Sequence, residues 1–464
     1  MEHTDYDLLV IGTGPSGQKA AVQGAKAGKR VAIVEKRHSV GGVCVNTGTI
    51  PSKTLREAAL YLSGFRERNI YGASYRVKQR IAMEDLVFRC DYVMRNEMEV
   101  IKHQMLRNRI DLLEGSAAFT DPHTVKITSF NGSEQSFTAG TIVIAVGTTP
   151  TRSPDVPFTP NRIVNSDEVM SMTEIPRTLC VVGAGVVGVE YASIFAALGV
   201  RVTLIDMRPT LLSFVDEELV DALTYHLRGL RVTVRLGEKV EGIELDPNED
   251  QVVTKLESGK RIVTQKALHS IGRTGATASL NLPAAGLTAD GRGRLQVNEH
   301  YQTAVPHIYA VGDVIGFPSL ASTSMEQGRL ASAHAFGIKA TSMPGLFPYG
   351  IYTIPEMSMV GRTEEELTKA GIPYEIGKAY YNEIARGQII GDHIGMLKLI
   401  FGLDDRKLLG VHAIGEGASE LIHIGQAVLA FGGTVDYFVN TVFNYPTLAE
   451  AYKVAALDGI NRLG

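Results

Sequence analysis

Two turns of the form Gly-x-Gly-x-x-Gly are the residues of this chain with the clearest chemical meaning. Their glycines are Gly12, Gly14 and Gly17 in the first turn and Gly183, Gly185 and Gly188 in the second. The leading glycine of such a turn allows a tight bend, the second lets the backbone approach a pyrophosphate, and the third lets helix and strand pack closely. The helix that follows offers free N–H groups to phosphate oxygens.

An acid follows each glycine turn at the same distance, at the end of the next apolar run: Glu35 in the first unit and Asp206 in the second. A carboxylate in this position accepts hydrogen bonds from ribose hydroxyls. Asp206 favours NAD, because it repels a 2′-phosphate. Arg208 either offsets that repulsion or is a solvated surface charge. One such turn is a weak signal, but the repeat with matched acids predicts two dinucleotide-binding units.

Length and composition narrow the class of protein. The chain has 464 residues, of which 44% are apolar and 21% charged, so roughly two to four globular domains are expected. The net charge of -4 argues against a nucleic-acid or membrane-surface partner. Three cysteines, Cys44, Cys90 and Cys180, are too few for a disulfide framework. The polar first residues lead us to expect no leader, and the sequence holds no run of 18 apolar residues. We therefore expect a cytoplasmic protein, and histidine spacing indicates no metal site.

The predicted elements divide the chain into four segments. They are residues 1–150 with the first glycine turn, 151–270 with the second, 271–346 returning to the first domain, and 347–464. Prolines after residue 150 mark the first crossing. In the last segment, 396–401 and 408–415 read as antiparallel strands followed by a helix over 418–431. This organisation predicts an α/β fold with two Rossmann-like dinucleotide-binding domains and a C-terminal α+β domain.

The segment from Gly41 to Lys53, GGVCVNTGTIPSK, adds a cysteine motif. With this segment, Val-Gly-Asp at 311–313, Tyr352–Glu356 and a C-terminal Pro-Thr-x-x-Glu, the chain resembles the flavin-dependent pyridine nucleotide disulfide oxidoreductases over essentially its whole length. The resemblance implies FAD on the first glycine turn and NAD or NADP on the second. It also implies that Asp313 binds the flavin ribityl chain. Gly147 and Gly272 are further expected cofactor-binding positions.

The chain departs from that family at two places. The redox disulfide needs two cysteines with four residues between them, but Thr49 stands in the second place after Cys44. The family's C-terminal histidine base is replaced by Tyr445, five residues before Glu450. An unperturbed tyrosine titrates near pH ~10, so it is a poor base at neutrality. Both losses remove the same half-reaction, which is the transfer of electrons to a disulfide.

The remaining pattern resembles the soluble pyridine nucleotide transhydrogenases within the family, which share the Thr-Ile-Pro-Ser-Lys and Asn-Tyr-Pro-Thr segments. This resemblance implies ping-pong hydride transfer through flavin N5, with NADPH binding first and NAD⁺ then using the same site. It implies that Lys53 stabilises charge on the reduced flavin and that Glu190 orients Lys53. The unpaired Cys44 either packs over the flavin or tunes it.

The resemblance also implies a homodimer held by the C-terminal domain, in which Tyr445 and Glu450 face the flavin of the partner subunit. Three alternatives remain open. The chain could be an NAD(P)H diaphorase or oxidase, because that activity also needs only a flavin and a nicotinamide site. It could be a dihydrolipoyl-dehydrogenase-like flavoprotein, which Thr49 and Tyr445 disfavour. It could be a non-catalytic flavoprotein subunit, which the intact second glycine turn disfavours.

Overall fold

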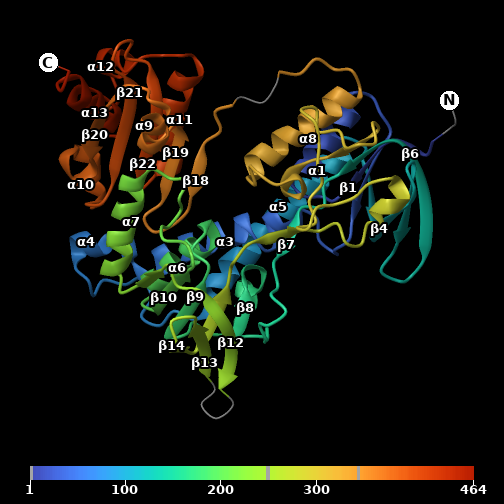
Figure 1. Ribbon diagram of the computed structural model, residues 1–464, viewed down its shortest axis with the longest axis horizontal. Coiled ribbons are helices and arrows are strands. Elements are labelled where there is room, and N and C mark those ends of the chain that lie inside the picture. Colours follow the sequence, from blue (N-terminus) through green and yellow to red (C-terminus); the bar gives the residue numbers. More distant parts are fainter. Residues whose placement is uncertain (1–3, 247–250, 342–344, 464) are drawn as a thin grey trace. The chain divides into compact units, whose positions relative to one another are not determined.

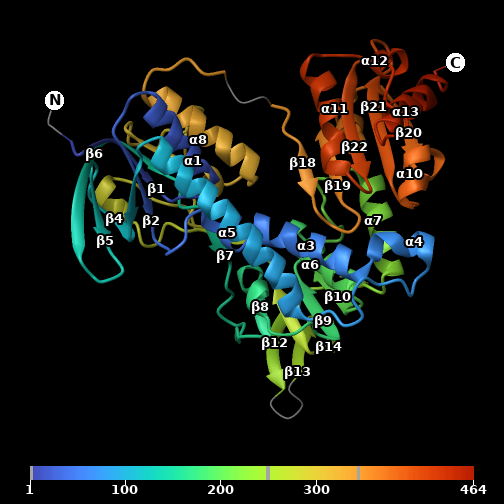
Figure 2. The ribbon, with the colours of Figure 1, turned by 180° about the vertical axis from the view of Figure 1, so that it is seen from behind.

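The computed structural model describes residues 4–246, 251–341 and 345–463 (Figures 1 and 2). The chain divides into two compact units. The first takes Met1–Thr54, Val87–Thr151 and Gly272–Met343, and the second takes Leu55–Leu86, Arg152–Ile271 and Pro344–Gly464. Two helices, α3 (Thr49–Ser63) and α5 (Met83–Arg107), each carry residues of both units.

The first unit is built on parallel strands in the order β3-β2-β1-β6, with β17 also pairing with β6. Its strands are β1 (Tyr6–Ile11), β2 (Val31–Glu35), β3 (Asp111–Glu114), β4 (Ser116–Asp121), β5 (Thr124–Thr128), β6 (Glu134–Ile144), β7 (Thr148–Pro150), β16 (Arg273–Gly275) and β17 (Ile308–Ala310). Its other helices are α1 (Pro15–Lys26), α2 (Gly42–Asn46), α8 (Ala321–Ala335) and the 3-10 turns η3 (Leu282–Ala285) and η4 (Gly312–Ile315). The first half of β6 turns away to pair antiparallel with β5, which pairs with β4.

Burial on both faces of the parallel sheet explains the apolar run in β1. Leu8 and Val10 enter one core cluster, and Leu9 and Ile11 enter another, all with 4% exposure or less. A parallel strand covered on both sides reads as a continuous hydrophobic run rather than an alternating one. Helices α1 and α8 lie side by side (Figure 1), and they approach so closely that a Cβ on Gly328 would collide with the carbonyl of Ser16.

A second parallel sheet, in the order β11-β10-β9-β15-β8, forms one part of the second unit. Its strands are β8 (Ile163–Asn165), β9 (Thr178–Val182), β10 (Arg201–Asp206), β11 (Thr233–Leu236) and β15 (Lys266–His269), and an antiparallel sheet holds β12 (Val240–Asp246), β13 (Gln251–Leu256) and β14 (Arg261–Thr264). The helical elements here are η1 (Phe65–Glu67), α4 (Arg68–Tyr71), η2 (Ser166–Ser171), α6 (Val186–Ala197) and α7 (Glu217–Gly229). Helix α6 follows the second glycine turn as α1 follows the first.

The C-terminal part of the second unit is an antiparallel sheet in the order β18-β19-β22-β21-β20. Its strands are β18 (Tyr349–Ile351), β19 (Met357–Gly361), β20 (Tyr374–Tyr380), β21 (Met396–Gly402) and β22 (Leu408–Ile414). Its helical elements are α9 (Glu364–Ala370), η5 (Tyr381–Glu383), α10 (Ala385–Ile390), α11 (Ala418–Ala430), α12 (Asp436–Asn440) and α13 (Glu450–Ile460). Helices α11 and α13 share one core, where the buried Tyr452 hydroxyl donates to the Leu421 carbonyl and accepts from the Gly425 N–H.

The predicted α/β fold with two nucleotide-binding sheets and a C-terminal α+β part is confirmed. The strands expected over 396–401 and 408–415 are β21 and β22, which pair antiparallel, and the following helix is α11. Within the part of the chain that the structure describes, every helix is too short or too polar to cross a membrane. The division of the chain into four segments stays a prediction.

Candidate active site

The first glycine turn joins β1 to α1 and leaves backbone groups open. Gly12 has a φ of 111°, and a Cβ there would collide with the carbonyl of Ala145. Gly17 packs its Cα against the carbonyl of Gly12, so a side chain at this position is also excluded. Gly14 caps α1 without a side-chain hydrogen bond, and a Cβ there would meet only open space. The N–H groups of the first helical turn are therefore accessible to an anion.

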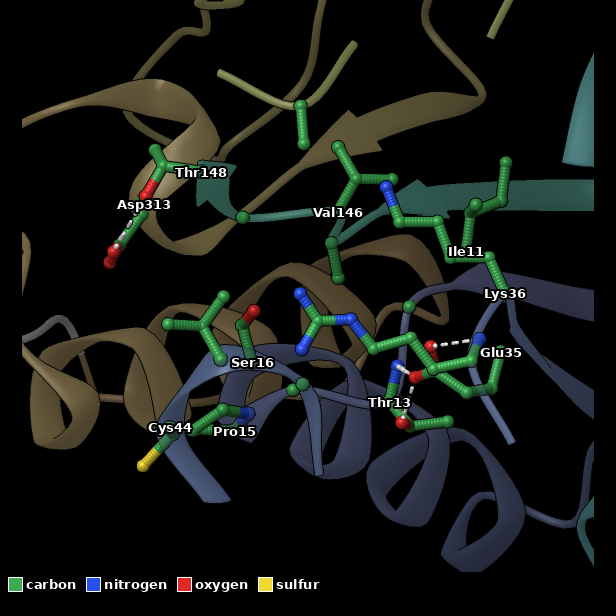
Figure 3. Close-up of a pocket in the computed structure, with 18 of the residues that line it drawn as sticks. Ile11, Thr13, Pro15, Ser16, Glu35, Lys36, Cys44, Val146, Thr148 and Asp313 are labelled. Carbon is green, nitrogen blue, oxygen red and sulfur yellow. Dashed lines mark hydrogen bonds between the residues drawn. The ribbon is translucent and has the colours of Figure 1, made fainter. Parts of the chain in front are cut away.

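A cavity of the first unit runs along this turn (Figure 3). It is lined by the glycine turn and Glu35 at one end, and by Cys44, Thr49, Gly147 and Asp313 elsewhere. These residues come from five separate stretches of sequence that the parallel sheet brings together at the carboxyl ends of its strands. That edge is where open α/β sheets bind their ligands.

Glu35 is held at the rim of the cavity by the turn itself. Its carboxylate accepts hydrogen bonds from the Thr13 hydroxyl, from the Thr13 N–H at 3.4 Å and from the Arg37 N–H at 2.9 Å. The Thr13 hydroxyl also accepts from the Gly41 N–H at 2.9 Å, which ties the turn to the start of α2. Thr13 occupies a variable position of the glycine motif, so its linking role carries no signal in the sequence.

Cys44 lies in α2 and Thr49 begins α3, and both residues line this cavity. The Thr49 hydroxyl makes a hydrogen bond with the Cys44 sulfur, but burial outweighs it and raises the pKa of the thiol. Lys53 lies one turn beyond Thr49 on α3. The other two cysteines are buried elsewhere, and desolvation raises their pKa values to about 12 at Cys90 and about 11 at Cys180.

Asp313 is the second residue of η4 and lies against a polar pair, Thr148 and Arg273, that no sequence motif indicates. Burial raises the pKa of its carboxyl, while Arg273 and Thr148 act in the opposite direction. Arg273 donates to the Thr148 hydroxyl at 2.8 Å and to its carbonyl at 3.0 Å. Gly147 precedes this pair with a φ of 65°, and the Gly272 carbonyl accepts from the Thr151 N–H at 3.0 Å. Thr148 and Arg273 come from distant segments, so only the folded chain shows their association.

The second glycine turn repeats the first in the second unit. Gly183 has a φ of 102°, Gly188 packs against the carbonyl of Gly183, and Gly185 caps α6 without a side chain. Asp206 accepts from the Ala184 N–H at 2.6 Å, as Glu35 accepts from Thr13. The turn residue is alanine here, so no hydroxyl competes for the carboxylate.

Arg208 supplies side-chain hydrogen bonds to Asp206, as the Thr13 hydroxyl does to Glu35 in the first turn. Its Nε and Nη2 donate to the Asp206 oxygens at 2.9 and 2.6 Å. The guanidinium also stands 3.9 Å from where a Cβ of Gly185 would be, so it lies beside the glycine turn. Burial of Asp206 opposes ionisation, but the hydrogen bonds from Arg208 and the backbone keep its pKa below the usual range. Arg208 remains 47% exposed and is therefore reachable by a ligand.

Glu190 lies on α6 of the second unit and is 4% exposed. Its Oε1 accepts from the Tyr352 N–H at 2.8 Å. Lys53 belongs to the first unit, so the expected pairing of Lys53 with Glu190 stays a prediction. Tyr445 is 74% exposed, and Glu450 begins α13 and accepts from the Thr447 N–H at 3.2 Å. Their expected position at the partner's site is likewise a prediction.

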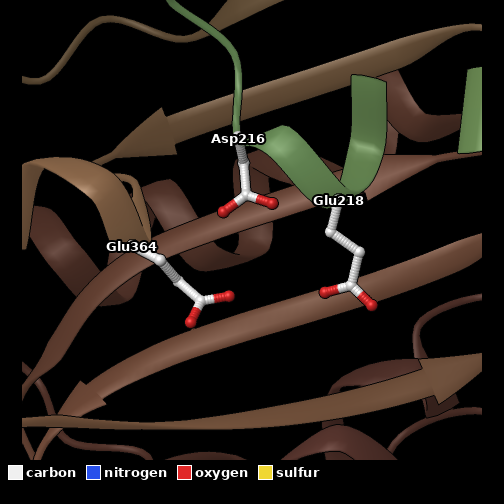
Figure 4. A group of neighbouring side chains, drawn as sticks. All are labelled: Asp216, Glu218 and Glu364. Carbon is white, nitrogen blue, oxygen red and sulfur yellow. The ribbon is translucent and has the colours of Figure 1, made fainter. Parts of the chain in front are cut away.

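A cluster of acids lies away from both glycine turns. Figure 4 shows the carboxylates of Asp216, Glu218 and Glu364 converging. The Nζ of Lys398 lies among them, 2.9 and 3.0 Å from the Asp216 oxygens, 3.1 Å from Glu218 and in contact with Glu364. Asp216 and Lys398 are 0% and 1% exposed, whereas Glu218 and Glu364 are partly exposed. The cluster is therefore an ion network with a buried centre, between helix α7 and the C-terminal sheet.

Two proteins similar to this chain, from different organisms, carry the same name. A soluble pyridine nucleotide transhydrogenase of Mycobacterium bovis is 54% identical over 460 residues, covering 99% of this chain and 98% of the relative. A protein of the same name from Colwellia psychrerythraea is 46% identical, covering 99% of both chains.

Solved structures show the same fold. The HOCl-induced flavoprotein disulfide reductase RclA of Escherichia coli matches with a TM-score of 0.88 and 27% identity, covering 97% of this chain and 99% of that one. LpdA of Mycobacterium tuberculosis matches with a TM-score of 0.89 at 24% identity, covering 98% and 99%. The family model of the pyridine nucleotide-disulphide oxidoreductases matches residues 6–328, and that of their dimerisation domain matches 347–456. The chain therefore belongs to the pyridine nucleotide-disulphide oxidoreductase family.

Proposed function

We propose that this protein is an FAD-dependent transhydrogenase that moves hydride between NADPH and NAD⁺. The observation that carries the proposal is that Thr49, and not a second cysteine, lines the cavity of the first unit together with Cys44. The chain also keeps both dinucleotide-binding turns. A hydroxyl cannot form a disulfide, so electrons entering the site have no thiol relay through which to leave. The relatives named as transhydrogenases support the same conclusion. We further propose that the enzyme works in the cytoplasm.

The cavity of the first unit fits FAD. Gly12 and Gly17 keep the turn tight because neither has room for a Cβ, whereas a Cβ on Gly14 would project into open space. The open first turn of α1 therefore suits a pyrophosphate. Glu35 would bind the ribose hydroxyls, and Asp313, beside Gly147, would bind the ribityl chain. When bound, FAD supplies a group that accepts a hydride from one nicotinamide and returns it to another.

The protein's own residues would bind the nicotinamide nucleotides, orient Lys53 and stabilise charge near the flavin. The second turn, with Gly183, Gly185 and Gly188, would bind the pyrophosphate of either nicotinamide nucleotide, and Gly272 would lie near it. Lys53 would stabilise negative charge near the flavin, and Glu190 would orient Lys53. Hydride transfer then depends on positioning and electrostatics, which are the contributions that a protein makes to a cofactor reaction.

The assembly that we propose is a homodimer in which residues 347–464 form the interface. The match of the dimerisation-domain model to 347–456 supports it. Tyr445 and Glu450 would then face the partner subunit's flavin. Residues 1–150 and 271–346 would make the FAD domain, and 151–270 the nicotinamide domain.

A paired assay on the purified yellow protein tests the function. NADPH is offered with thio-NAD⁺ in one reaction, and with lipoamide or glutathione disulfide in others. Rapid reduction of thio-NAD⁺ with inert disulfides is the expected result. Inert thio-NAD⁺ with rapid reduction of oxygen or quinone would make the protein a diaphorase, and rapid lipoamide reduction would make it dihydrolipoyl-dehydrogenase-like.

Replacing Arg208 with alanine is expected to weaken NADPH binding more than NADH binding. Arg208 lies beside the glycine turn, and a charge-assisted hydrogen bond to a 2′-phosphate contributes about 1.5–3 kcal/mol, or roughly 10- to 100-fold in Kd. Titration of the protein with the oxidised nucleotides measures both constants. Arg201→Ala, at the exposed start of β10, is the matched control. An equal loss for both nucleotides would make Arg208 a general binding residue.

Replacing Cys44 with serine is expected to leave thio-NAD⁺ reduction within about threefold of the wild-type rate. The thiol pKa is raised by burial, so at neutral pH the sulfur is not the thiolate that redox chemistry needs. Serine keeps a hydrogen-bonding partner for Thr49. Complete loss of activity in Cys44→Ser would show that the thiol takes part in the reaction and would contradict the thiol-free route.

A further inference from the structure

The segment Tyr352–Glu356, between β18 and β19, is called the strap here. It binds residues of three helices, α6, α3 and α11, and all of these residues belong to the second unit. On one side it holds α6. The Tyr352 N–H donates to Glu190 Oε1 at 2.8 Å, and the Ile354 N–H donates to Ser193 Oγ at 3.0 Å. Ser193 lies one helical turn after Glu190 and is 0% exposed. The strap therefore fixes one carboxylate oxygen of Glu190 and the backbone turn that carries it.

On the other side the strap is held by Arg56 of α3. The Arg56 Nε donates to the Thr353 carbonyl at 2.9 Å, and its Nη2 lies 3.5 Å from Glu356 Oε2. The remaining Nη1 donates to Glu57 Oε1 at 2.6 Å. Arg56 is 3% exposed and Thr353 is 0% exposed, so the geometry is set by packing as well as by hydrogen bonds.

Glu356 is anchored in turn by the start of α11. Its Oε1 accepts from the Ser419 N–H at 3.2 Å and from the Ser419 hydroxyl at 3.1 Å. Burial raises the pKa of the Glu356 carboxyl, and the nearby Arg56 cation opposes that shift. The strap is thus clamped at three points, to α6, α3 and α11.

We propose that Arg56 is a positioning residue for hydride transfer. Lys53 lies one turn before Arg56 on α3, and Glu190 is fixed by the same strap that Arg56 binds. Arg56 therefore joins two elements. One is the turn of α3 that follows Lys53, and the other is the strap, which orients the carboxylate of Glu190. The guanidinium group of Arg56 is required, because its planar arrangement of donors reaches three acceptors in different directions. The ammonium group of a lysine, on a flexible side chain, cannot reproduce this geometry. This inference rests on the proposed function, in which Lys53 and Glu190 act together.

The test must distinguish two roles of Arg56, namely positioning the strap and compensating the charge of Glu356. Arg56→Met alone leaves Glu356 buried and unpaired, which destabilises the fold for reasons unrelated to catalysis. The double variant R56M/E356Q removes both charges, and the glutamine keeps an acceptor for Ser419. Loss of both members of a buried pair is often nearly neutral for stability. Arg66→Met is the matched control, because Arg66 pairs with Glu57 and Glu416 and not with the strap.

Two readouts are taken on the FAD-containing protein without NAD⁺. In single-turnover mixing with NADPH, R56M/E356Q is expected to lower the limiting rate of flavin reduction by about 10- to 100-fold with the Kd of NADPH within about threefold. Hydrogen exchange at the Tyr352 and Ile354 amides is expected to accelerate by at least about tenfold. Arg56→Lys should restore thermal stability but not the limiting rate. Arg66→Met should leave both readouts unchanged.

The experiment distinguishes failure of the positioning role of Arg56 from failure of the proposed transhydrogenase function. A wild-type limiting rate in R56M/E356Q, or unchanged amide exchange in the strap, would overturn the positioning role. A wild-type rate in Arg56→Lys would show that only a charge is needed and would also overturn it. If the wild-type protein failed to reduce thio-NAD⁺, the proposed function would fail, and the flavin-reduction and exchange comparisons would still decide the role of Arg56.

Discussion

Replacing Lys53 with alanine is expected to slow flavin reduction by NADPH by about a hundredfold while FAD stays bound. Removal of one preorganised group that stabilises developing charge typically costs 10²–10³ in rate. FAD should be retained, because its expected contacts come from the glycine turn, Glu35 and Asp313 rather than from Lys53. Single-turnover absorbance at the flavin band measures the rate, and the spectrum of the purified variant measures FAD content.

Lys102→Ala is the control for this prediction, because Lys102 lies exposed on α5 and pairs only with the exposed Glu99 among the contacts found in the described chain. Glu190→Gln should give a smaller loss than Lys53→Ala, since the amide oxygen still accepts from the Tyr352 N–H. Unchanged reduction kinetics in Lys53→Ala would remove the assigned role, and loss of FAD would make Lys53 a cofactor-binding residue instead.

Replacing Lys398 with methionine is expected to lower the free energy of unfolding by about 3–5 kcal/mol. Lys398 is 1% exposed and balances Asp216, which is 0% exposed, together with Glu218 and Glu364. Burial alone would favour the neutral amine, but hydrogen bonds to Glu364 and Asp216 raise the pKa of Lys398 above its ordinary value. Taking away the cation leaves the buried carboxylate of Asp216 uncompensated, which is the costly way to break such a pair. Urea unfolding followed by circular dichroism measures the loss.

Two further variants identify the cause of the expected loss. Lys378→Met removes a partly exposed partner of Glu218 and should cost no more than about 1 kcal/mol. Lys398→Met combined with Asp216→Asn should recover part of the stability, because the most deeply buried charge is removed with its partner. Equal stability of Lys398→Met and the wild-type protein would show that water or the surrounding acids compensate the site without the lysine.

Much of the nucleotide-binding architecture could be predicted from the sequence, because its determinants are local. Gly12 and Gly183 adopt positive φ values that other residues reach only with strain, so the turns are marked by residue type. The strand before each turn is buried on both faces and reads as an apolar run, and the antiparallel pair β21 and β22 shows equally clear apolar runs. The pairing of Cys44 with Thr49 also follows from spacing along one short segment.

The remaining contacts depend on which distant segments the fold brings together. Arg56 and Glu356 are 300 residues apart in the sequence, and no sequence motif indicates that they pair. The same holds for Thr148 with Arg273 and for Asp216 with Lys398. A buried charge needs a partner, but residue type alone does not say which of many charges supplies it.

The two dinucleotide-binding turns and the lack of a disulfide relay can be recognised from the sequence alone, because turn geometry and thiol chemistry are properties of neighbouring residues. Three contacts appear only in the folded chain: Arg208 with Asp206 beside the second turn, the strap with Glu190, and Lys398 with the three acids around it. Those contacts arise when packing excludes water and leaves each buried polar group to find its partner within the protein.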